Sequence, residues 1–140
     1  MVFPSVSVLG WVLGGLSAMV VGMIWYSPFL FGKQWGEALG VSEKQMNKDR
    51  AKVMPVLIVM SLLTAYILSV FTAYFMRYTG KSAVMSGFDT AVLAFAGFAG
   101  TALIAHDVFD PRPRAKMYIN LGNRLITLVV MGLIIGAFVK

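Results

Sequence analysis

The sequence concentrates its polarity in one stretch, HDVFDPRPRAKMYINLGNR at residues 106–124, which separates two long apolar runs. The stretch holds the only histidine, two of the six acidic residues and four of the twelve basic residues. An α-helix needs about 20 largely apolar residues to cross a hydrocarbon core roughly 30 Å thick. We therefore expect the stretch to be a turn between two transmembrane helices.

The composition of the whole chain indicates a membrane protein as well. Hydrophobic residues make up 59% of the 140 residues and charged residues 13%, with a mean hydropathy of +0.79. The chain has no cysteine, which excludes disulfides, thiolate nucleophiles and cysteine metal sites, and one histidine cannot form a His-rich metal site. No cofactor or metal is expected. The net charge of +6 is typical of basic loops facing anionic lipid, and no soluble basic domain exists to bind nucleic acid.

The apolar runs predict an all-α polytopic membrane protein with four transmembrane helices in two antiparallel hairpins. We expect a single domain over residues 1–140, with spans at about 6–26, 53–75, 82–105 and 120–139. No Lys or Arg precedes the first span, so it is expected to be a retained helix rather than a secretory signal. The aromatic residues at 29–35 predict a short interfacial segment between the first two helices. Ser42-Glu43-Lys44-Gln45 has the spacing of a capping box, which predicts a short polar helix beginning near Glu43.

Small residues recur at four-residue spacing on the predicted helices. Such faces let two helix backbones approach closely in lipid. Because every span carries small residues, more than one antiparallel bundle needs, we expect a homo-oligomer. The clearest packing positions are Gly10, Gly14, Ala18 and Gly22 on the first span and Gly132 and Gly136 on the fourth.

Basic residues are distributed unequally between the two sides of the predicted bundle. An excess of Lys and Arg marks the cytoplasmic side, so we expect both termini outside, in the bacterial cytoplasmic (inner) membrane. The first and third connections carry Lys33, Lys44, Lys48, Arg50, Lys52, Arg112, Arg114 and Lys116, whereas the opposite side carries Arg77, Lys81 and Lys140.

Asp89 is an ionisable residue inside the predicted third span. It lies seven residues in, which corresponds to about 10 Å of helix. Acids at such depth are functional candidates, since they must face protein or water. Structural pairing and a shallow interfacial position close to Arg77 or Lys81 are the two other interpretations.

Arg124 is the second such residue, because the uncharged part of the fourth span begins only at Leu125. Its side chain must extend to the membrane surface or pair within the bundle. Asn120, Asn123 and Arg124 have the spacing of one helix face. We expect this face to contact Asp107 or Asp110 at the inner membrane boundary.

His106, Asp107 and Asp110 allow three interpretations. The aspartates would cap the turn and pair with a nearby arginine (Arg112, Arg114 or Arg124), or the three residues would form a proton or ion relay, or they would bind a divalent metal through oxygen and imidazole ligands. An enzyme is disfavoured, since no nucleophile lies beside a base and neighbouring residues on a helix point apart.

Two motifs resemble a known family. The first is Trp25-Tyr26-Ser27-Pro28, followed by Phe31-Gly32-Lys33 and Trp35; the second comprises Phe109-Asp110, Arg112-Pro113 and Ile119-Asn120-Leu121-Gly122. Together they resemble the first inner turn, the second inner turn and the start of the fourth helix in domain-of-unknown-function family 1761. The resemblance implies a small bacterial four-helix membrane protein and no established activity.

Two functions remain open from the sequence. The first is an oligomeric channel or small transporter for ions or a small solute, with Asp89 toward the outside and His106, Asp107, Asn120, Asn123 and Arg124 toward the inside. The alternative is a non-transporting membrane module that binds lipid headgroups or a larger membrane-protein partner. Its support is the aromatic and basic surface at residues 29–52.

Overall fold

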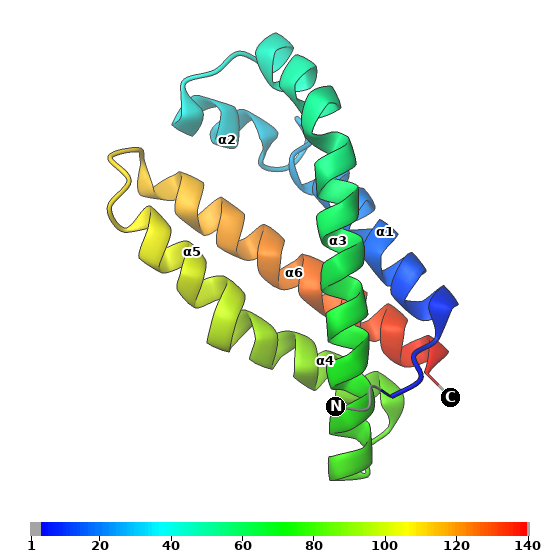
Figure 1. Cartoon of the computed structure of the whole chain (residues 1–140). Helices are drawn as coiled ribbons and strands as arrows, with labels where there is room; N and C mark the ends of the chain where they lie inside the picture. The colour runs from blue at the N-terminus through cyan, green and yellow to red at the C-terminus, as the bar shows by residue number, and fades with distance from the viewer. Residues whose placement is uncertain (1–3, 140) are drawn as a thin grey trace.

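Helices and the turns that join them make up the whole of the described structure, a computed structural model covering residues 4–139 apart from the side chains of residues 43 and 50 (Figure 1). Four helical segments are long and apolar enough to cross a membrane: Val8–Trp25, Ala51–Thr79, Ala83–Asp107 and Arg114–Phe138. The all-α fold class is confirmed. Lys140 and the side chain of Arg50, which contributed to the orientation argument, lie outside the described residues.

The first hairpin begins with α1 (Val8–Trp25), which starts where Ser7 Oγ accepts a hydrogen bond from the Gly10 N–H at 3.2 Å. A short helix, α2 (Gly32–Leu39), follows and ends at Gly40, whose φ of 70° favours glycine. The predicted interfacial segment thus becomes helical from Gly32 onward. Its helix contacts both α3 and α6.

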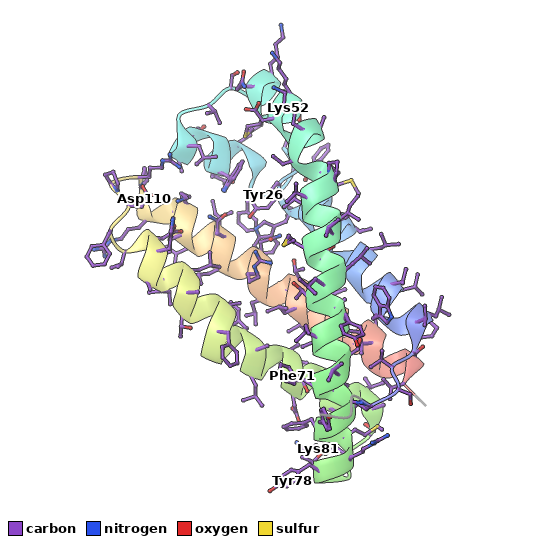
Figure 2. The ribbon with its side chains drawn as sticks, viewed as in Figure 1. Tyr26, Lys52, Phe71, Tyr78, Lys81 and Asp110 are labelled. Atoms are coloured by element: carbon purple, nitrogen blue, oxygen red, sulfur yellow. The ribbon has the colours of Figure 1, made fainter. Side chains whose placement is uncertain are left out.

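The helix α3 (Glu43–Thr79) is continuous over 37 residues, or about 55 Å. It begins at Ser42, whose Oγ accepts a hydrogen bond from the Gln45 N–H at 3.3 Å, as the capping-box spacing indicates. The polar helix predicted to begin near Glu43 continues through Pro55 into the second span as one helix. Figure 2 shows Lys52 toward one end of this helix and Tyr78 toward the other.

The second hairpin consists of α4 (Ala83–Ala94), a π-helical turn η1 (Phe95–Ala99), α5 (Gly100–Asp107) and α6 (Arg114–Phe138). The first three form one span in which the π turn inserts an extra residue, a feature often found at functional sites. The helix α6 begins six residues before the start expected from length, because its first turns carry charged residues that resemble a loop in sequence.

The helix α6 lies at the centre of the bundle and contacts α1, α3, α4 and α5. The buried core consists of Ala65, Leu68, Ala91, Leu128, Met131 and Ile135. Figure 1 places the start of α1 and the end of α6 at one end of the bundle and the α1–α2 and α5–α6 connections at the other. It also shows α3 crossing α6 and separating from α5 toward the end that carries these connections.

The glycine faces pack within the chain. A Cβ at Gly14 would lie 3.0 Å from Ile135 Cγ1, and the backbones of Gly87 and Gly132 touch where α4 crosses α6. A Cβ at Gly136 would lie 2.5 Å from the Ala83 carbonyl oxygen, whereas Gly22 has no such neighbour within 4 Å. Of the predicted packing positions, Gly10, Gly14, Gly132 and Gly136 therefore make close contacts within the chain, and Gly22 does not.

Candidate functional site

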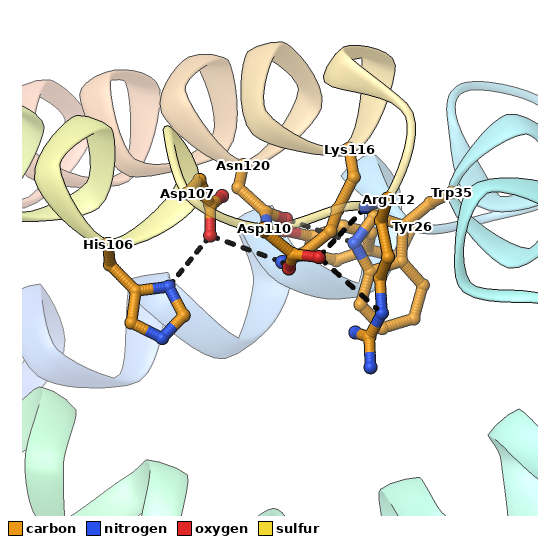
Figure 3. A network of polar contacts seen from close by, with 8 residues as sticks. All are labelled: Tyr26, Trp35, His106, Asp107, Asp110, Arg112, Lys116 and Asn120. Carbon is orange, nitrogen blue, oxygen red and sulfur yellow. Dashed lines mark hydrogen bonds and ion pairs between the residues drawn. The ribbon is translucent and has the colours of Figure 1, made fainter.

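Three aromatic residues of the first connection bind the start of α6, and we call them the aromatic clamp (Trp25, Tyr26 and Trp35). Trp25 Nε1 donates a hydrogen bond to the carbonyl oxygen of Ile119 at 3.0 Å. The Tyr26 hydroxyl and Trp35 Nε1 both donate to Asn120 Oδ1, each at 3.0 Å (Figure 3). One amide oxygen therefore joins the end of α1 to α2 and α6.

Tight turns bring the aromatic clamp into position. The carbonyl oxygen of Ser27 accepts hydrogen bonds from the backbone N–H groups of Leu30 and Gly32. A side chain at Gly32 would place its Cβ 2.7 Å from that oxygen, so only glycine fits. At Gly122 a Cβ would lie 2.7 Å from the Trp25 ring. Pro28 and Lys33 are exposed.

The residues of the polar turn form an acid–base cluster, which we define as His106, Asp107, Asp110, Arg112 and Lys116. Lys116 Nζ lies 3.1 Å from Asp107 Oδ1 and 2.6 Å from Asp110 Oδ2 (Figure 3). His106 Nδ1 lies 2.8 Å from Asp107 Oδ1, and the Arg112 N–H donates to Asp110 Oδ1 at 3.0 Å. Asp107 and Lys116 are largely buried, with side chains 4% and 11% exposed.

Electrostatics hold Asp110 in its ionised form. The hydrogen bond from Lys116, followed by the one from the backbone of Arg112, lowers the pKa of its carboxyl below the ordinary value of 3.8. In the described part of the chain, no group of three His, Asp or Glu side chains is placed to hold a metal ion. The lysine ammonium occupies the position between the two carboxylates. The geometry of the acid–base cluster therefore resembles a structural ion pair that closes the α5–α6 turn.

The contact expected between Arg124 and the turn aspartates requires correction. Asp107 and Asp110 contact Lys116 instead, a residue that the sequence argument counted only as a basic charge. Arg124 lies eight residues further along α6, or about 12 Å. Among the residues with described side chains, no carboxylate lies within 4 Å of its guanidinium. The position of Lys116 in the first turn of α6 is the signal that could have identified it.

Asp89 lies at the opposite end of the molecule. Its Oδ2 is 2.6 Å from Lys81 Nζ, and the two side chains are 24% and 49% exposed. Lys81 belongs to the short α3–α4 connection. Of the three interpretations of Asp89, the geometry favours pairing with Lys81 near the surface.

Asn123 and Arg124 line a cavity of about 310 Å³ between α1, α3 and α6, which we call the polar cavity. Asn123 Nδ2 is buried, and no hydrogen-bond partner is present for it within the described chain. The Asn120 amide points into the aromatic clamp instead, so the predicted face of three polar residues divides between two sites. The other lining residues are Ala18, Met19, Gly22, Met23, Tyr26, Met54, Leu57, Met60, Ser61, Thr64, Thr127, Leu128 and Met131.

The two ends of the polar cavity differ in their lining. Tyr26 and Met54 lie at the end nearer to the aromatic clamp, whereas Leu128 and Met131 belong to the buried core at the other end. The hydroxyls of Ser61 and Thr64 donate to carbonyl oxygens of their own helix, each at 2.9 Å. Within the described chain, the donors of this cavity without a hydrogen bond are the Thr127 hydroxyl, the Asn123 amide and the Arg124 guanidinium. A guanidinium suits a carboxylate or phosphate.

Comparison with known proteins identifies a family and no characterised relative. No curated protein and no solved structure matches the chain. The family model described as "Protein of unknown function (DUF1761)" matches residues 9–136. The match covers both the aromatic clamp and the start of α6 that it binds. The chain therefore belongs to the DUF1761 family, as its two motifs indicated.

Proposed function

We propose that this membrane protein binds an anionic group, carboxylate or phosphate, in the polar cavity. One observation carries the proposal: Asn123 and Arg124 line the same cavity, the buried Asn123 Nδ2 has no hydrogen-bond partner within the described chain, and no carboxylate with a described position reaches Arg124. An oxyanion would accept hydrogen bonds from both groups. A planar guanidinium is well suited to this role because it can donate two parallel hydrogen bonds to one anion.

The depth of Arg124 supports a functional rather than a purely structural role. The helix α6 continues for only about 21 Å beyond it, less than the roughly 30 Å of a hydrocarbon core. The guanidinium therefore lies at membrane depth or extends from it toward the surface. Charged residues there are costly and usually pair with an opposite charge or line a ligand path.

A channel or small transporter for an anion is the second candidate. The polar cavity favours it, because it extends from the Tyr26 end toward the middle of the bundle. An open channel through one chain is disfavoured, since the buried core lies between the cavity and the Lys81–Asp89 pair. Transport would require this core to separate during each cycle.

We also propose an orientation in the membrane and an assembly state. We place the α1–α2 and α5–α6 end in the cytoplasm, and both termini outside a bacterial inner membrane, because that end carries most of the basic residues. The glycine contacts within the chain leave less support for a homo-oligomer than the sequence did. A monomer with a membrane-embedded binding site is sufficient for the function proposed here.

The test is anion binding by protein purified in nanodiscs of zwitterionic lipid. Calorimetry would measure the affinity for inorganic phosphate and glycerol phosphate in wild type, Arg124→Gln and Arg114→Gln. Arg114→Gln is the matched control, because it removes the same charge from the exposed first turn of the same helix. A hydrogen bond to a charged group contributes about 1.5–3 kcal/mol, so Arg124→Gln should weaken binding by roughly 10-fold to 150-fold.

Two results would contradict binding in the polar cavity: no measurable anion binding by the wild type, or equal losses in the two variants. Anion flux into liposomes then separates binding from transport. Flux that disappears in Arg124→Gln favours the transporter, and binding without flux favours the non-transporting module.

A further inference from the structure

Arg124 also lines a groove on the surface, separate from the polar cavity, between α3 and the span formed by α4, η1 and α5. It consists of three adjoining hollows of about 360, 440 and 350 Å³. Each shares lining residues with the next, so together they form one lateral groove. Arg124 lines its first part, and the shared residues that define its course are Thr64, Ala99 and Leu128, then Phe71, Ala94 and Phe98.

The lateral groove follows the C-terminal half of α3 beside α4 and η1, and only its first part reaches α5. The π turn contributes to the wall, because its extra residue changes which side chains face α3. Ala94 and Ala99 line the groove with short side chains that do not fill it. Phe98, which is 74% exposed, lines the groove instead of packing into the core. Figure 2 shows Phe71 and Tyr78 along the C-terminal half of α3, where the groove continues.

The length and lining of the groove suit a hydrocarbon chain. From Thr64 to Tyr78 the groove follows α3 for about 21 Å. One leaflet of a 30 Å hydrocarbon core is only about 15 Å thick, so the groove is longer than one leaflet. Apart from Arg124 its lining is apolar, aromatic or hydroxyl-bearing, with no second charged residue in the three hollows.

We infer that the lateral groove holds an acyl chain of an anionic lipid whose head binds Arg124. The inference rests on the proposed function, since Arg124 is shared by the polar cavity and the groove. Charge complementarity selects an anionic head over a zwitterionic one. The guanidinium binds the phosphate or carboxylate, and the aromatic side chains farther along contact the chain.

Charge complementarity also disfavours a second copy of this protein as the occupant of the lateral groove. A helix seated in the groove would need an acid at membrane depth to face Arg124. The spans contain Asp89 and Asp107, and these are bound to Lys81 and Lys116 at opposite ends of the molecule. A lipid brings its own negative charge to the required depth.

Photo-crosslinking tests the inference directly. Nanodiscs would contain a trace of phosphatidylglycerol or phosphatidylcholine bearing a diazirine in the acyl chain, and mass spectrometry would locate the labelled residues. The measured quantity is the labelling of Phe71 and Phe98 divided by the labelling of the exposed Leu13 and Leu16 of α1. We expect this ratio to be at least fivefold higher with phosphatidylglycerol than with phosphatidylcholine. Arg124→Gln should abolish this enrichment. Equal labelling by the two lipids, or enrichment that survives the substitution, would overturn the inference.

The controls separate this inference from the proposed function. Arg114→Gln should keep the enrichment. If glycerol phosphate binds in an Arg124-dependent way but labelling stays at the level of α1, the polar cavity stands and the acyl-chain site does not exist. If neither experiment depends on Arg124, both proposals fail. Phe98→Cys in this cysteine-free chain tests the second copy, because disulfide-linked dimers through this position would overturn occupation by lipid.

Discussion

Replacing Asn120 tests whether the family motifs serve the fold. Leucine has the same branched shape but no acceptor, so in Asn120→Leu the Tyr26 hydroxyl and Trp35 Nε1 both lose the oxygen that they bind at 3.0 Å. A hydrogen bond contributes about 0.5–1.5 kcal/mol, and a donor left without its acceptor costs about 1–3 kcal/mol. Both donors are only partly buried, which favours the lower values. We expect a loss of about 2–4 kcal/mol in the free energy of unfolding.

Aspartate at the same position provides the matched control. Asn120→Asp keeps an acceptor oxygen at the position of Oδ1 and replaces the amide NH2 group by a second oxygen. Its charge lies four residues from both Lys116 and Arg124 on α6, a spacing at which opposite charges attract. We expect its stability to stay within about 1 kcal/mol of wild type. The assay is reversible unfolding by sodium dodecyl sulfate in mixed micelles, followed by fluorescence of Trp25 and Trp35, which lie at the affected joint.

A double-mutant cycle isolates the hydrogen bond from packing. Trp35→Phe removes the indole N–H but keeps an aromatic ring beside Tyr26, 4.9 Å from centroid to centroid in the native pair. Combined with Asn120→Leu it should show a coupling of about 1 kcal/mol. The reasoning is refuted if Asn120→Asp destabilises as much as Asn120→Leu, or if the two substitutions are additive.

Three further predictions concern packing and charge. Gly132→Ala should lower the free energy of unfolding by about 1–3 kcal/mol, because its Cβ would meet the Gly87 carbonyl oxygen. Gly97→Ala should not lower it, because a Cβ there would have no neighbour within 4 Å. Chemical denaturation measures the free energy of unfolding of both variants. Asp110→Asn should lower the thermal midpoint at about pH 6. In the folded protein the pKa of Asp110 is lowered below 3.8, so its carboxylate stabilises the fold at pH values above 3.8. This stabilisation disappears as the pH falls through the folded pKa. The thermal midpoints of wild type and Asp110→Asn should therefore converge at low pH. Asp89→Asn should change stability by less than about 1 kcal/mol and leave anion binding intact, since its ion pair is partly exposed.

Hydropathy and helix-end chemistry made much of the fold predictable. Four apolar segments separated by polar turns follow from the length of a membrane-spanning helix, and Ser42 marks the start of α3 through its side chain. The start of α6 was less predictable, because Arg114 and Lys116 are charged but belong to helical turns beyond the apolar part. Hydropathy reports the membrane boundary, and helices extend past it.

The candidate site was predictable in its residues but not in its shape. Helical spacing placed Asn123 and Arg124 close together, but the walls of the polar cavity come from α1 and α3, which are distant in sequence. The hydrogen bond from Tyr26 to Asn120 joins residues 94 positions apart, and no periodicity in a single sequence reveals such a pair. The contact of Lys116 with Asp107 and Asp110 is local in sequence, so it could have been predicted from the position of Lys116 in the first turn of α6.

The pairing of charges gives the strongest reason to look for function at Arg124. The two turn aspartates have Lys116, and Asp89 has Lys81, so the acids that lie in the spans already contact other cations. A cation near the centre of a membrane helix costs about 2.5–3.5 kcal/mol on insertion scales, and a purely structural arginine would be expected to recover this through a carboxylate. Arg124 lines two hollows instead, the polar cavity and the first part of the lateral groove. The anionic lipid proposed above would contact both of these hollows through a single molecule.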